Sequence, residues 1–221
     1  MVHSARTLAD GMRDRRNPFV AQEGILPLVL AGFLCGYALL YHGVWPASLP
    51  AAVFVLLYLL FRDPRRFVPS VALGVVSPVD GMVESVTTTD RCVVLGEAYC
   101  IRIRINPLGA YTARSPVEGR VMDLRSKTES PGADRDCPVN ALWVETDEGS
   151  SVVLQLHEHR FGLAPQAFVG LGERLGQGQR CAYIRLARVA EVYVPVAGKV
   201  HAEPGRRVTA GSDVIAAVPQ P

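Results

Sequence analysis

The feature that most constrains the fold is a long run without charged side chains. Residues 24–61 contain no Asp, Glu, Lys or Arg, which makes 38 consecutive uncharged positions in a chain of 221. A helix needs about 20 apolar residues to cross a bilayer, so the run is too long for one crossing and just long enough for two. Its middle, residues 41–46, holds a glycine, a proline and two aromatic residues typical of membrane interfaces. The pattern predicts a transmembrane hairpin with helices over about residues 24–41 and 46–61.

Basic residues on both sides of the run predict its orientation. The flanking arginines are Arg13, Arg15, Arg16, Arg62, Arg65 and Arg66, whereas the loop between the two predicted helices has no Lys or Arg. Because positive charge is retained on the cytoplasmic side, both ends of the hairpin are expected in the cytoplasm, at the inner membrane of a bacterium. A secretory signal would begin nearer the start and would be shorter. A hairpin buried in the core of a soluble domain is the alternative.

The run divides the chain into three parts. Residues 1–22 are expected to form a cytoplasmic tail, either a surface helix or a frayed end; residues 23–62 form the hairpin and residues 63–221 a separate domain.

After residue 66, short segments rich in Val and Ile are broken by Gly and Pro, and no long helical period follows. Strands are predicted over residues 92–95, 99–105, 141–146, 151–156 and 189–194.

One turn sequence occurs three times in the predicted β domain. The pattern Pro-Val-x-Gly-x-Val lies within residues 77–83, 115–121 and 194–200. Proline fixes φ on entry to a turn, glycine permits a positive φ, and the valines begin the next strand. Tight turns between short strands predict a mainly β fold, a compact lipoyl-like β-sandwich or barrel. A role as a lipoyl or biotinyl carrier is disfavoured, since Lys199 lacks the Met or Asp neighbours common beside such a lysine.

Arginines and isoleucines alternate along one predicted strand. Arg102 and Arg104 lie between isoleucines, so a strand places the isoleucines on one face and the arginines on the other. Arginine pairs well with phosphate oxygens. The arginine face is therefore either simply solvated or able to hold a lipid phosphate.

Charge, cysteine and histidine content exclude several classes of function. The net charge is +2 and the basic residues are scattered among acids, so no nucleic-acid partner is expected. The five cysteines have no CxxC spacing, which argues against a disulfide framework and favours a reducing compartment. His157 and His159 flank Glu158 on a predicted strand and would share a face. Two histidines alone seldom hold a metal ion, so no metal is expected.

Five short motifs follow one another along the chain. They are Phe-Arg-Asp-Pro-Arg-Arg at 61–66, Ser-Pro-Val-Asp-Gly at 77–81, Asn-Pro-Leu-Gly-Ala-Tyr-Thr-Ala-Arg-Ser-Pro-Val-Glu-Gly at 106–119, Gly-Glu-Arg at 172–174 and Glu-Val-Tyr-Val-Pro at 191–195. In this order they resemble the short bacterial and archaeal form of the phosphatidylserine decarboxylase family. The resemblance implies a membrane enzyme of phospholipid metabolism that converts phosphatidylserine to phosphatidylethanolamine and CO₂.

The resemblance also implies a cofactor that the chain makes from itself. In that family a Ser that follows a Gly attacks the preceding carbonyl, the chain splits, and a pyruvoyl group remains on the new amino terminus. This group forms a Schiff base with the lipid amine and serves as the electron sink for loss of CO₂. An Asp and a His are the groups implied to activate the serine.

Matched position by position, the family residues are only partly retained. Asp80 stands where the family has its Asp, and Tyr111 where it has its His. Arg114 matches the family's Arg and Asn140 the last residue of its Asn-Glu-Arg-Asn block, and both are candidates for substrate binding. Asp80 is either a retained base or a turn residue. Tyr111 is either a proton carrier or a packing residue, and a phenol with a pKa of about 10 is a poor base.

The processing site departs furthest from the family pattern. Ala187 and Arg188 stand where Gly and Ser are expected. Residues 152–208 contain no Ser or Thr, and Cys181, the one other candidate nucleophile there, lies seven residues too early. Without a hydroxyl or thiol at the site, the pyruvoyl group cannot form by the family route. We therefore expect no cofactor in this chain.

Three functions remain open from the sequence. The first is a membrane-anchored relative that does not process itself and binds phospholipid, with the membrane, phosphatidylserine and either a second copy or an active paralogue as partners. The second is an active phosphatidylserine decarboxylase that reaches its cofactor by another route or is complemented by a paralogue. The third is a structural membrane protein that keeps only the β scaffold, since fold alone does not establish function.

Overall fold

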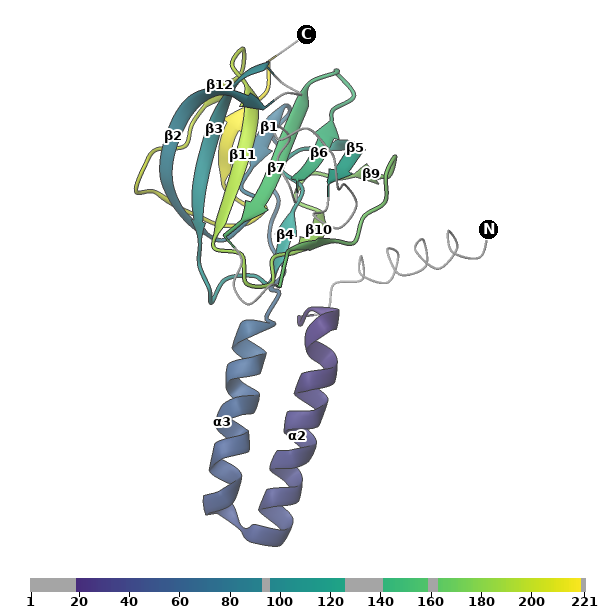
Figure 1. Cartoon of the computed structure of the whole chain (residues 1–221), viewed down its shortest axis with the longest axis vertical. Helices are drawn as coiled ribbons and strands as arrows, with labels where there is room; N and C mark the ends of the chain where they lie inside the picture. Colours follow the sequence, from purple (N-terminus) through teal and green to yellow (C-terminus); the bar gives the residue numbers. More distant parts are fainter. Residues whose placement is uncertain (1–18, 93–95, 126–140, 159–162, 220–221) are drawn as a thin grey trace, which may run out of the picture.

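Two helices extend from a β domain in the structure, which is a computed structural model (Figure 1). It describes residues 19–92, 96–125, 141–158 and 163–219. Helix α2 spans Gln22–His42 and helix α3 spans Val44–Leu60, and the described residues after α3 form strands, turns and loops. The prediction of a mainly β domain after two N-terminal helices is therefore confirmed.

The two helices lie side by side as a hairpin that projects away from the β domain (Figure 1). Gly43 alone links them, with a φ of 86°, so the break is shorter than the predicted 41–46. Helix α3 begins at Val44 rather than at Pro46. Proline is tolerated in the first turn of a helix, because the N–H that it lacks would have no partner inside the helix.

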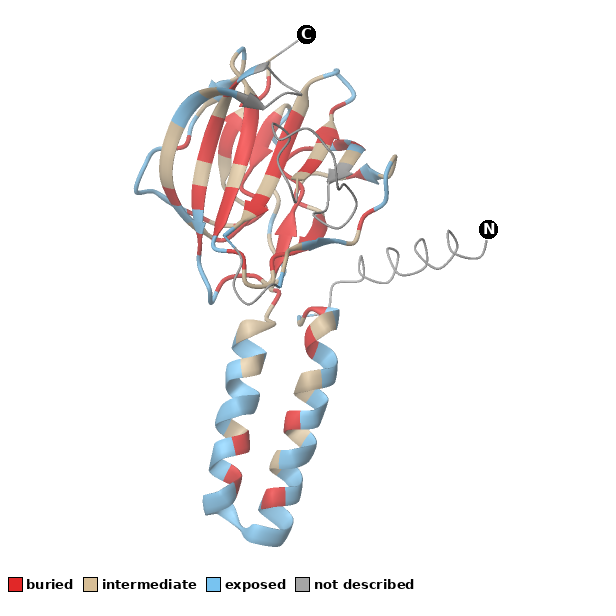
Figure 2. Cartoon of the chain, viewed as in Figure 1, coloured by how far each residue is buried: buried red, intermediate tan, exposed pale blue. Residues whose placement is uncertain are grey.

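The hairpin exposes its large apolar side chains, as the pale blue helices of Figure 2 show. Phe33, Leu40 and Trp45 are 77%, 83% and 90% exposed. Where the helices face each other the buried residues are small, among them Ala31 and Ala38, and small residues let two helices approach closely. Only 17% of the apolar window of α2 is buried, so the alternative of a hairpin buried in the core is wrong.

By length and composition, α2 is the one described helix that could cross a membrane. Helix α3 is also apolar but has only 17 residues. At 1.5 Å per residue it spans about 26 Å, slightly less than the roughly 30 Å of a hydrocarbon core. The predicted pair of spanning helices is thus corrected to one helix of spanning length and one shorter apolar helix.

The described strands form three antiparallel sheets. The large sheet has the order β13-β2-β3-β11-β7-β6-β5-β9, with strands Arg207–Val208, Gly81–Cys92, Gly96–Ile105, Val189–Pro195, Ser151–His157, Ala141–Glu145, Gly119–Arg125 and Arg174–Leu175. One small sheet has the order β1-β14-β12, with strands Gly74–Val76, Val214–Ala217 and Lys199–Val200. The other has the order β4-β10-β8, with strands Thr112–Arg114, Arg180–Tyr183 and Gln166–Ala167.

Four of the five predicted strands correspond to β3, β6, β7 and β11. The fifth, predicted over residues 92–95, lies outside the described residues except for its first residue, which ends β2. On β3, Ile101 and Ile103 are fully buried in a core shared by the sheets, whereas Arg102 and Arg104 lie on the outer face. The predicted alternation is therefore confirmed.

The first two copies of the repeated turn fold alike. The Ser77 hydroxyl donates a 2.8 Å hydrogen bond to the carbonyl of Val79, and the Ser115 hydroxyl donates an equivalent 2.7 Å bond to Val117. Both valines are buried and lead into a strand of the large sheet. The repeated sequence thus encodes one local structure twice.

The glycines of these turns are required for a different reason from the one predicted. Gly81 and Gly119 do not have a positive φ. A Cβ on either would lie 2.2 Å from a carbonyl oxygen of the neighbouring strand, that of Arg104 or of Glu145. The prediction of a positive φ is therefore wrong, and glycine is needed for the close approach of two backbones.

The two ends of the hairpin are fixed together at the base of the β domain. Val20 and Arg62 form an antiparallel bridge, and the N–H of Ala21 donates a 2.9 Å hydrogen bond to the carbonyl of Phe61. A Cβ at Gly24 would lie 2.4 Å from the Phe61 side chain, so only glycine fits there. The start of α2 and the end of α3 therefore enter the domain side by side.

Candidate functional site

A cavity of about 520 Å³ opens where the hairpin meets the β domain. Its wall comes from Leu60 at the end of α3, from the end of β3 and the loop after it (residues 104–107 and 109–111), from Glu158 after β7, and from residues 184–189, which lead into β11. The volume is in the range of small-molecule sites. Apolar and charged side chains both line it, as a site for an amphiphile requires.

The position of the expected processing site forms part of this wall. Ala187 is buried and Arg188 is exposed, and both line the cavity. The N–H of Arg188 donates to the carbonyl of His157 at 3.2 Å, and its own carbonyl accepts from the N–H of Ile105 at 2.8 Å. The backbone at Arg188 is thus held between the ends of β3 and β7, at the start of β11.

Tyr111 lines the cavity and reaches the hairpin. Its hydroxyl donates a 2.9 Å hydrogen bond to Oε2 of Glu23, and its ring centroid lies 4.8 Å from that of Phe61. Burial, and then the contact with Glu23, hold the pKa of Tyr111 well above its usual range. The phenol is therefore protonated at neutral pH, so it serves as a hydrogen-bond donor and not as a base.

Glu23 also binds the opposite wall of the cavity through Arg185. Nη2 of Arg185 lies 2.6 Å from Oε1 of Glu23, and the same side chain bonds Gln166 and the carbonyl of Ala164. Arg185 has a φ of 52°, which is uncommon for a residue other than glycine. Glu23 is not among the residues predicted from the sequence, although it is the last charged residue before the uncharged run.

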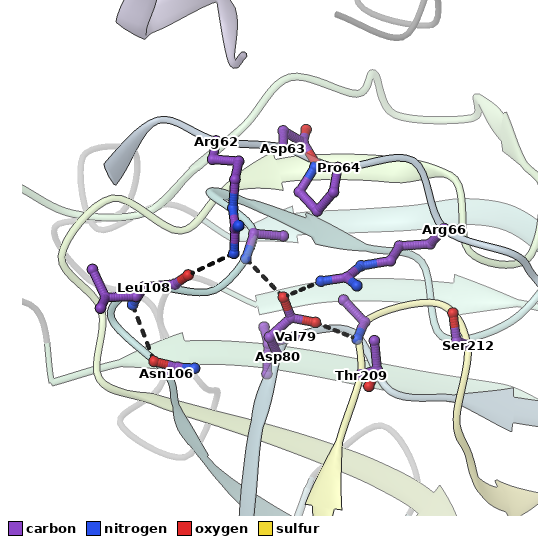
Figure 3. Close-up of polar contacts among 12 residues, drawn as sticks. Arg62, Asp63, Pro64, Arg66, Val79, Asp80, Asn106, Leu108, Thr209 and Ser212 are labelled. Carbon is purple, nitrogen blue, oxygen red and sulfur yellow. Dashed lines mark hydrogen bonds and ion pairs between the residues drawn. The ribbon is translucent and has the colours of Figure 1, made fainter. Parts of the chain in front are cut away.

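Asp80 is not among the residues that line the cavity, and Figure 3 shows the polar contacts of its carboxylate. Oδ2 accepts hydrogen bonds from Arg66 at 2.6 Å and from the N–H of Ala110 at 2.8 Å, and Oδ1 accepts one from the N–H of Ala210 at 2.8 Å. The side chain is buried, and these donors occupy both oxygens. This geometry favours the turn role of Asp80 over that of a base.

Comparison with known proteins identifies the family. No family model matches the chain. Over 207 residues it is 31% identical to the phosphatidylserine decarboxylase proenzyme of Nitrosomonas eutropha, covering 90% of this chain and 95% of that protein. It is 31% identical over 220 residues to the proenzyme of the same name from Burkholderia ambifaria, covering 92% and 98%. The chain belongs to the phosphatidylserine decarboxylase family.

Solved structures are also similar to the chain, and one of them is glucose permease IIA from Mycoplasma capricolum, at 16% identity and a TM-score of 0.44, covering 65% of this chain and 94% of that one.

The family motif at residues 61–66 contributes a buried carboxylate, Asp63. Its Oδ2 accepts a hydrogen bond from the Thr112 hydroxyl at 2.6 Å and pairs with Nε of Arg180 at 2.7 Å. Nη2 of Arg114 lies 3.7 Å from Oδ1. Burial raises the pKa of Asp63, while the hydroxyl and the two arginines act in the opposite direction. This cluster joins the segment after the hairpin to the small sheet β4-β10-β8.

The family's matching residues Arg114 and Asn140 were predicted to bind substrate. Arg114 is 6% exposed and donates 3.0 Å hydrogen bonds to the carbonyls of Gly178 and Pro64. It is not among the residues that line the cavity, so the structure places it in the fold and away from the site. Asn140 lies outside the described residues.

Cys181 and His157, two other candidates from the sequence, are also not among the residues that line the cavity. Cys181 is fully buried, its thiol donates to the carbonyl of Ala113 at 3.4 Å, and burial raises its pKa to about 12. Nε2 of His157 lies 3.2 Å from Oε1 of Glu191, and His159 is outside the described residues. Among the residues described, no three His, Cys, Asp or Glu are grouped as metal ligands.

Proposed function

We propose that this chain is a membrane-anchored member of the phosphatidylserine decarboxylase family that does not process itself and that binds a phospholipid headgroup in the cavity. The observation that carries the proposal is the position of Arg188 in the cavity wall. A guanidinium group stands in the cavity wall at the position that the resemblance matches to the family's processing serine. Arginine supplies no nucleophile for chain cleavage, but it is a good ligand for phosphate.

The other residues around Arg188 support the absence of processing. Among the described residues that line the cavity, Tyr111 carries the one hydroxyl and none carries a thiol. Tyr111 is protonated and bonded to Glu23, and Cys181 is fully buried with a raised pKa. Activation of a nucleophile requires a strong adjacent base or a lowered pKa. The pKa values of Tyr111 and Cys181 are both raised, and the carboxylate beside Tyr111 is already paired with Arg185.

The residues at the site do not fit the pyruvoyl group of the family. That group is made from a serine, and the chain has Arg188 there, preceded by Ala187 instead of glycine. Asp80, the retained family residue, is bonded to Arg66 and to two backbone N–H groups. We therefore assign no step of the decarboxylation to this chain.

The membrane placement rests on the hairpin and on the charges at its base. Helix α2 is apolar and exposed along its length, and Leu60 at the end of α3 lines the cavity. Arg62, Arg65 and Arg66 follow directly, which favours a cytoplasmic position for the β domain. The cavity would then lie at the level of the phospholipid headgroups.

The absence of processing is tested on a denaturing gel. The full chain is purified in detergent beside the relative from Nitrosomonas eutropha, whose name describes a proenzyme. We expect one band of 23.9 kDa for this chain. Release of a fragment of residues 188–221, together with CO₂ from phosphatidylserine, would overturn the proposal and assign decarboxylase activity instead.

Headgroup binding is tested by calorimetry on the full chain in detergent with short-chain phospholipids. Leu186→Trp places a large side chain in the cavity wall, and Leu171→Trp makes the same change at an exposed leucine outside it. We expect binding to the unaltered chain and to Leu171→Trp, and at least a tenfold loss in Leu186→Trp. An intact chain that binds no phospholipid would support the structural scaffold instead.

A further inference from the structure

Two large apolar side chains are exposed where the hairpin enters the β domain. Phe19 is 62% exposed and Leu108 is 55% exposed. The N–H of Asp63 donates a 2.9 Å hydrogen bond to the carbonyl of Phe19. Nη2 of Arg62, the first charged residue after the uncharged run, donates a 3.3 Å hydrogen bond to the carbonyl of Leu108. Both apolar residues therefore lie at the level where the chain leaves the hairpin.

Leu108 is at the tip of the loop between β3 and β4, in which residues 106–108 are exposed. Its N–H donates a 3.1 Å hydrogen bond to Oδ1 of Asn106, as Figure 3 shows, and the N–H of Gly109 donates one of 2.9 Å to the Asn106 carbonyl. A Cβ at Gly109 would lie 2.7 Å from the Asp80 side chain, so this side of the loop is packed against the domain. The turn is thus fixed, and it leaves the leucine side chain outside the core.

The exposed charge beside these two side chains is positive. Within the described part of the chain, neither Arg62 nor Arg65 has a carboxylate partner. The acid between them, Asp63, is 1% exposed and pairs with Arg180 at 2.7 Å. The guanidinium carbon of Arg65 lies 5.3 Å from the centroid of the Phe19 ring. An arginine beside an apolar side chain suits the surface of a bilayer, because the apolar group reaches the acyl chains while the guanidinium group stays with the phosphates.

We propose that these residues form a second membrane contact, in which the apolar pair enters the boundary between headgroups and acyl chains and the two arginines pair with lipid phosphates. This base surface consists of Phe19, Arg62, Arg65 and Leu108. Its partner is a bilayer that contains anionic phospholipid, since a negative surface attracts arginines. The hydrogen bonds that join the base surface to the end of the hairpin make the bilayer, and not a protein, the occupant next to it. The inference rests on the proposed membrane placement of the hairpin and adds a contact made by the β domain itself.

The contact has a consequence for the cavity. The loop that carries Leu108 also supplies Asn106, Pro107 and Gly109 to the cavity wall, and Leu60 at the end of α3 supplies another part of it. Insertion of the loop would therefore hold two parts of this wall at the bilayer surface. The hairpin fixes the β domain at one place, and a second point of attachment fixes its orientation.

The test uses photolabelling of the full chain in lipid nanodiscs. The discs contain phosphatidylcholine and phosphatidylglycerol, with a small share of a phosphatidylcholine that carries a diazirine on its acyl chain close to the ester bond. Mass spectrometry of peptides locates the label after irradiation. We expect label on the hairpin, on Leu108 and on Phe19. Leu171, which is 70% exposed in the turn before β9, should remain unlabelled because β9 lies away from the hairpin (Figure 1).

Leu108→Ser tests the inserted side chain. The substitution is at an exposed position outside the cavity lining, so the fold should tolerate it. We expect it to reduce labelling of residues 106–110 by about fivefold or more, because the loop no longer enters the acyl boundary. Leu171→Ser makes the same change away from the base surface and should leave the labelling of this loop as it is in the unaltered chain.

Arg65→Gln tests the phosphate contact. We expect it to reduce labelling of residues 106–110 by about two- to fivefold in discs with phosphatidylglycerol, and to lessen the difference between these discs and discs of phosphatidylcholine alone. Lys199→Gln is the control, since this exposed lysine is on β12, at the end of the domain away from the hairpin (Figure 1).

The outcomes separate this inference from the membrane placement on which it rests. Label on the hairpin with none on Leu108 or Phe19, or equal labelling of Leu108 and Leu171, would overturn the base surface and leave the hairpin in the membrane. Unchanged labelling in Leu108→Ser would overturn the insertion of the loop, and unchanged labelling in Arg65→Gln would overturn the phosphate contact. No label on the hairpin of a chain that still unfolds cooperatively on heating would overturn both proposals.

Discussion

The hydroxyl of Tyr111 and the carboxylate of Glu23 form a 2.9 Å hydrogen bond that connects the cavity to the first turn of the membrane hairpin. The same carboxylate pairs with Arg185 on the other wall. The position that the resemblance matches to the family's histidine therefore connects the β domain to the hairpin in this chain. Through this contact the first turn of the hairpin helps to position two side chains of the cavity wall, those of Tyr111 and Arg185.

Loss of this connection should loosen the cavity. Tyr111→Phe removes one hydrogen bond and is expected to cost about 0.5–1.5 kcal/mol of stability. Glu23→Ala removes the contacts to both walls and is expected to cost more, and to speed hydrogen exchange in residues 184–189 because Arg185 loses its partner. Thermal unfolding and hydrogen exchange of the full chain in detergent measure both effects. Glu97→Ala, at an exposed glutamate, is the control; equal exchange in both variants would contradict the connection.

Asp80 should behave as a structural residue. Asp80→Asn loses the ion pair with Arg66, and Asp80→Ala leaves that arginine and the N–H groups of Ala110 and Ala210 without their acceptor. We expect the free energy of unfolding to fall by about 1–3 kcal/mol in Asp80→Asn and by about 3–5 kcal/mol in Asp80→Ala. Asp147→Asn, which breaks an exposed ion pair with Arg174, should cost less than about 1 kcal/mol. Unfolding of Asp80→Ala at the temperature of the unaltered chain would contradict this role.

The sequence predicts the parts of this structure that depend on local pattern. A long uncharged run can adopt few structures other than apolar helices. The alternation of Ile and Arg along β3 indicates directly which face of the strand is buried. The tight contacts at Gly81 and Gly119 are made with Arg104 and Glu145 on the next strand, more than 20 residues further along the chain, so the local sequence suggested a turn conformation instead. The contact between Glu23 and Arg185 joins residues 162 apart, and no local pattern predicts it. The cavity is assembled from three loops and a helix end, and is therefore visible only in the fold.

The stability of the β domain should fall in acid because of Glu191. Its carboxylate lies 3.2 Å from Nε2 of His157, accepts a 2.8 Å hydrogen bond from Tyr193, and pairs with Arg102 at 2.8 Å. These contacts lower the pKa of Glu191 from an ordinary 4.5 to about 2, and the contact with His157 has the largest effect. The ionised form of Glu191 is more favourable in the folded state than in the unfolded state. Its contribution to stability is therefore complete above pH 4.5 and is lost as the pH falls towards 2.

The size of this loss is expected to be on the order of 2 kcal/mol. Thermal unfolding measured at a series of acidic pH values checks it. Glu191→Gln should be less stable than the unaltered chain at neutral pH and should lose less stability on acidification. Glu203→Gln, at an exposed glutamate, should follow the unaltered chain throughout. Parallel pH profiles for the Glu191→Gln variant and the unaltered chain would contradict the assignment.

Cys181 should be chemically inert in the folded chain. The thiol is fully buried and its pKa is raised to about 12, so neither access nor the thiolate form is available at neutral pH. N-ethylmaleimide followed by peptide mass spectrometry should leave Cys181 unmodified in detergent and modify it after denaturation. Rapid labelling of Cys181 in the folded chain would restore it as a candidate nucleophile for chain cleavage.

The stability of the helical hairpin should depend on its small buried residues and not on its large exposed ones. Ala38 is 8% exposed because α3 packs against it, whereas Leu40, two residues later, is 83% exposed. Ala38→Leu inserts atoms between closely packed helices and is expected to cost about 1–3 kcal/mol, since the backbones must separate. Leu40→Ala removes a side chain that touches little protein and should change the thermal midpoint in detergent far less. A larger effect of Leu40→Ala would mean that α2 is rotated about its axis relative to α3, because the face that it buries would then be the one that carries Leu40.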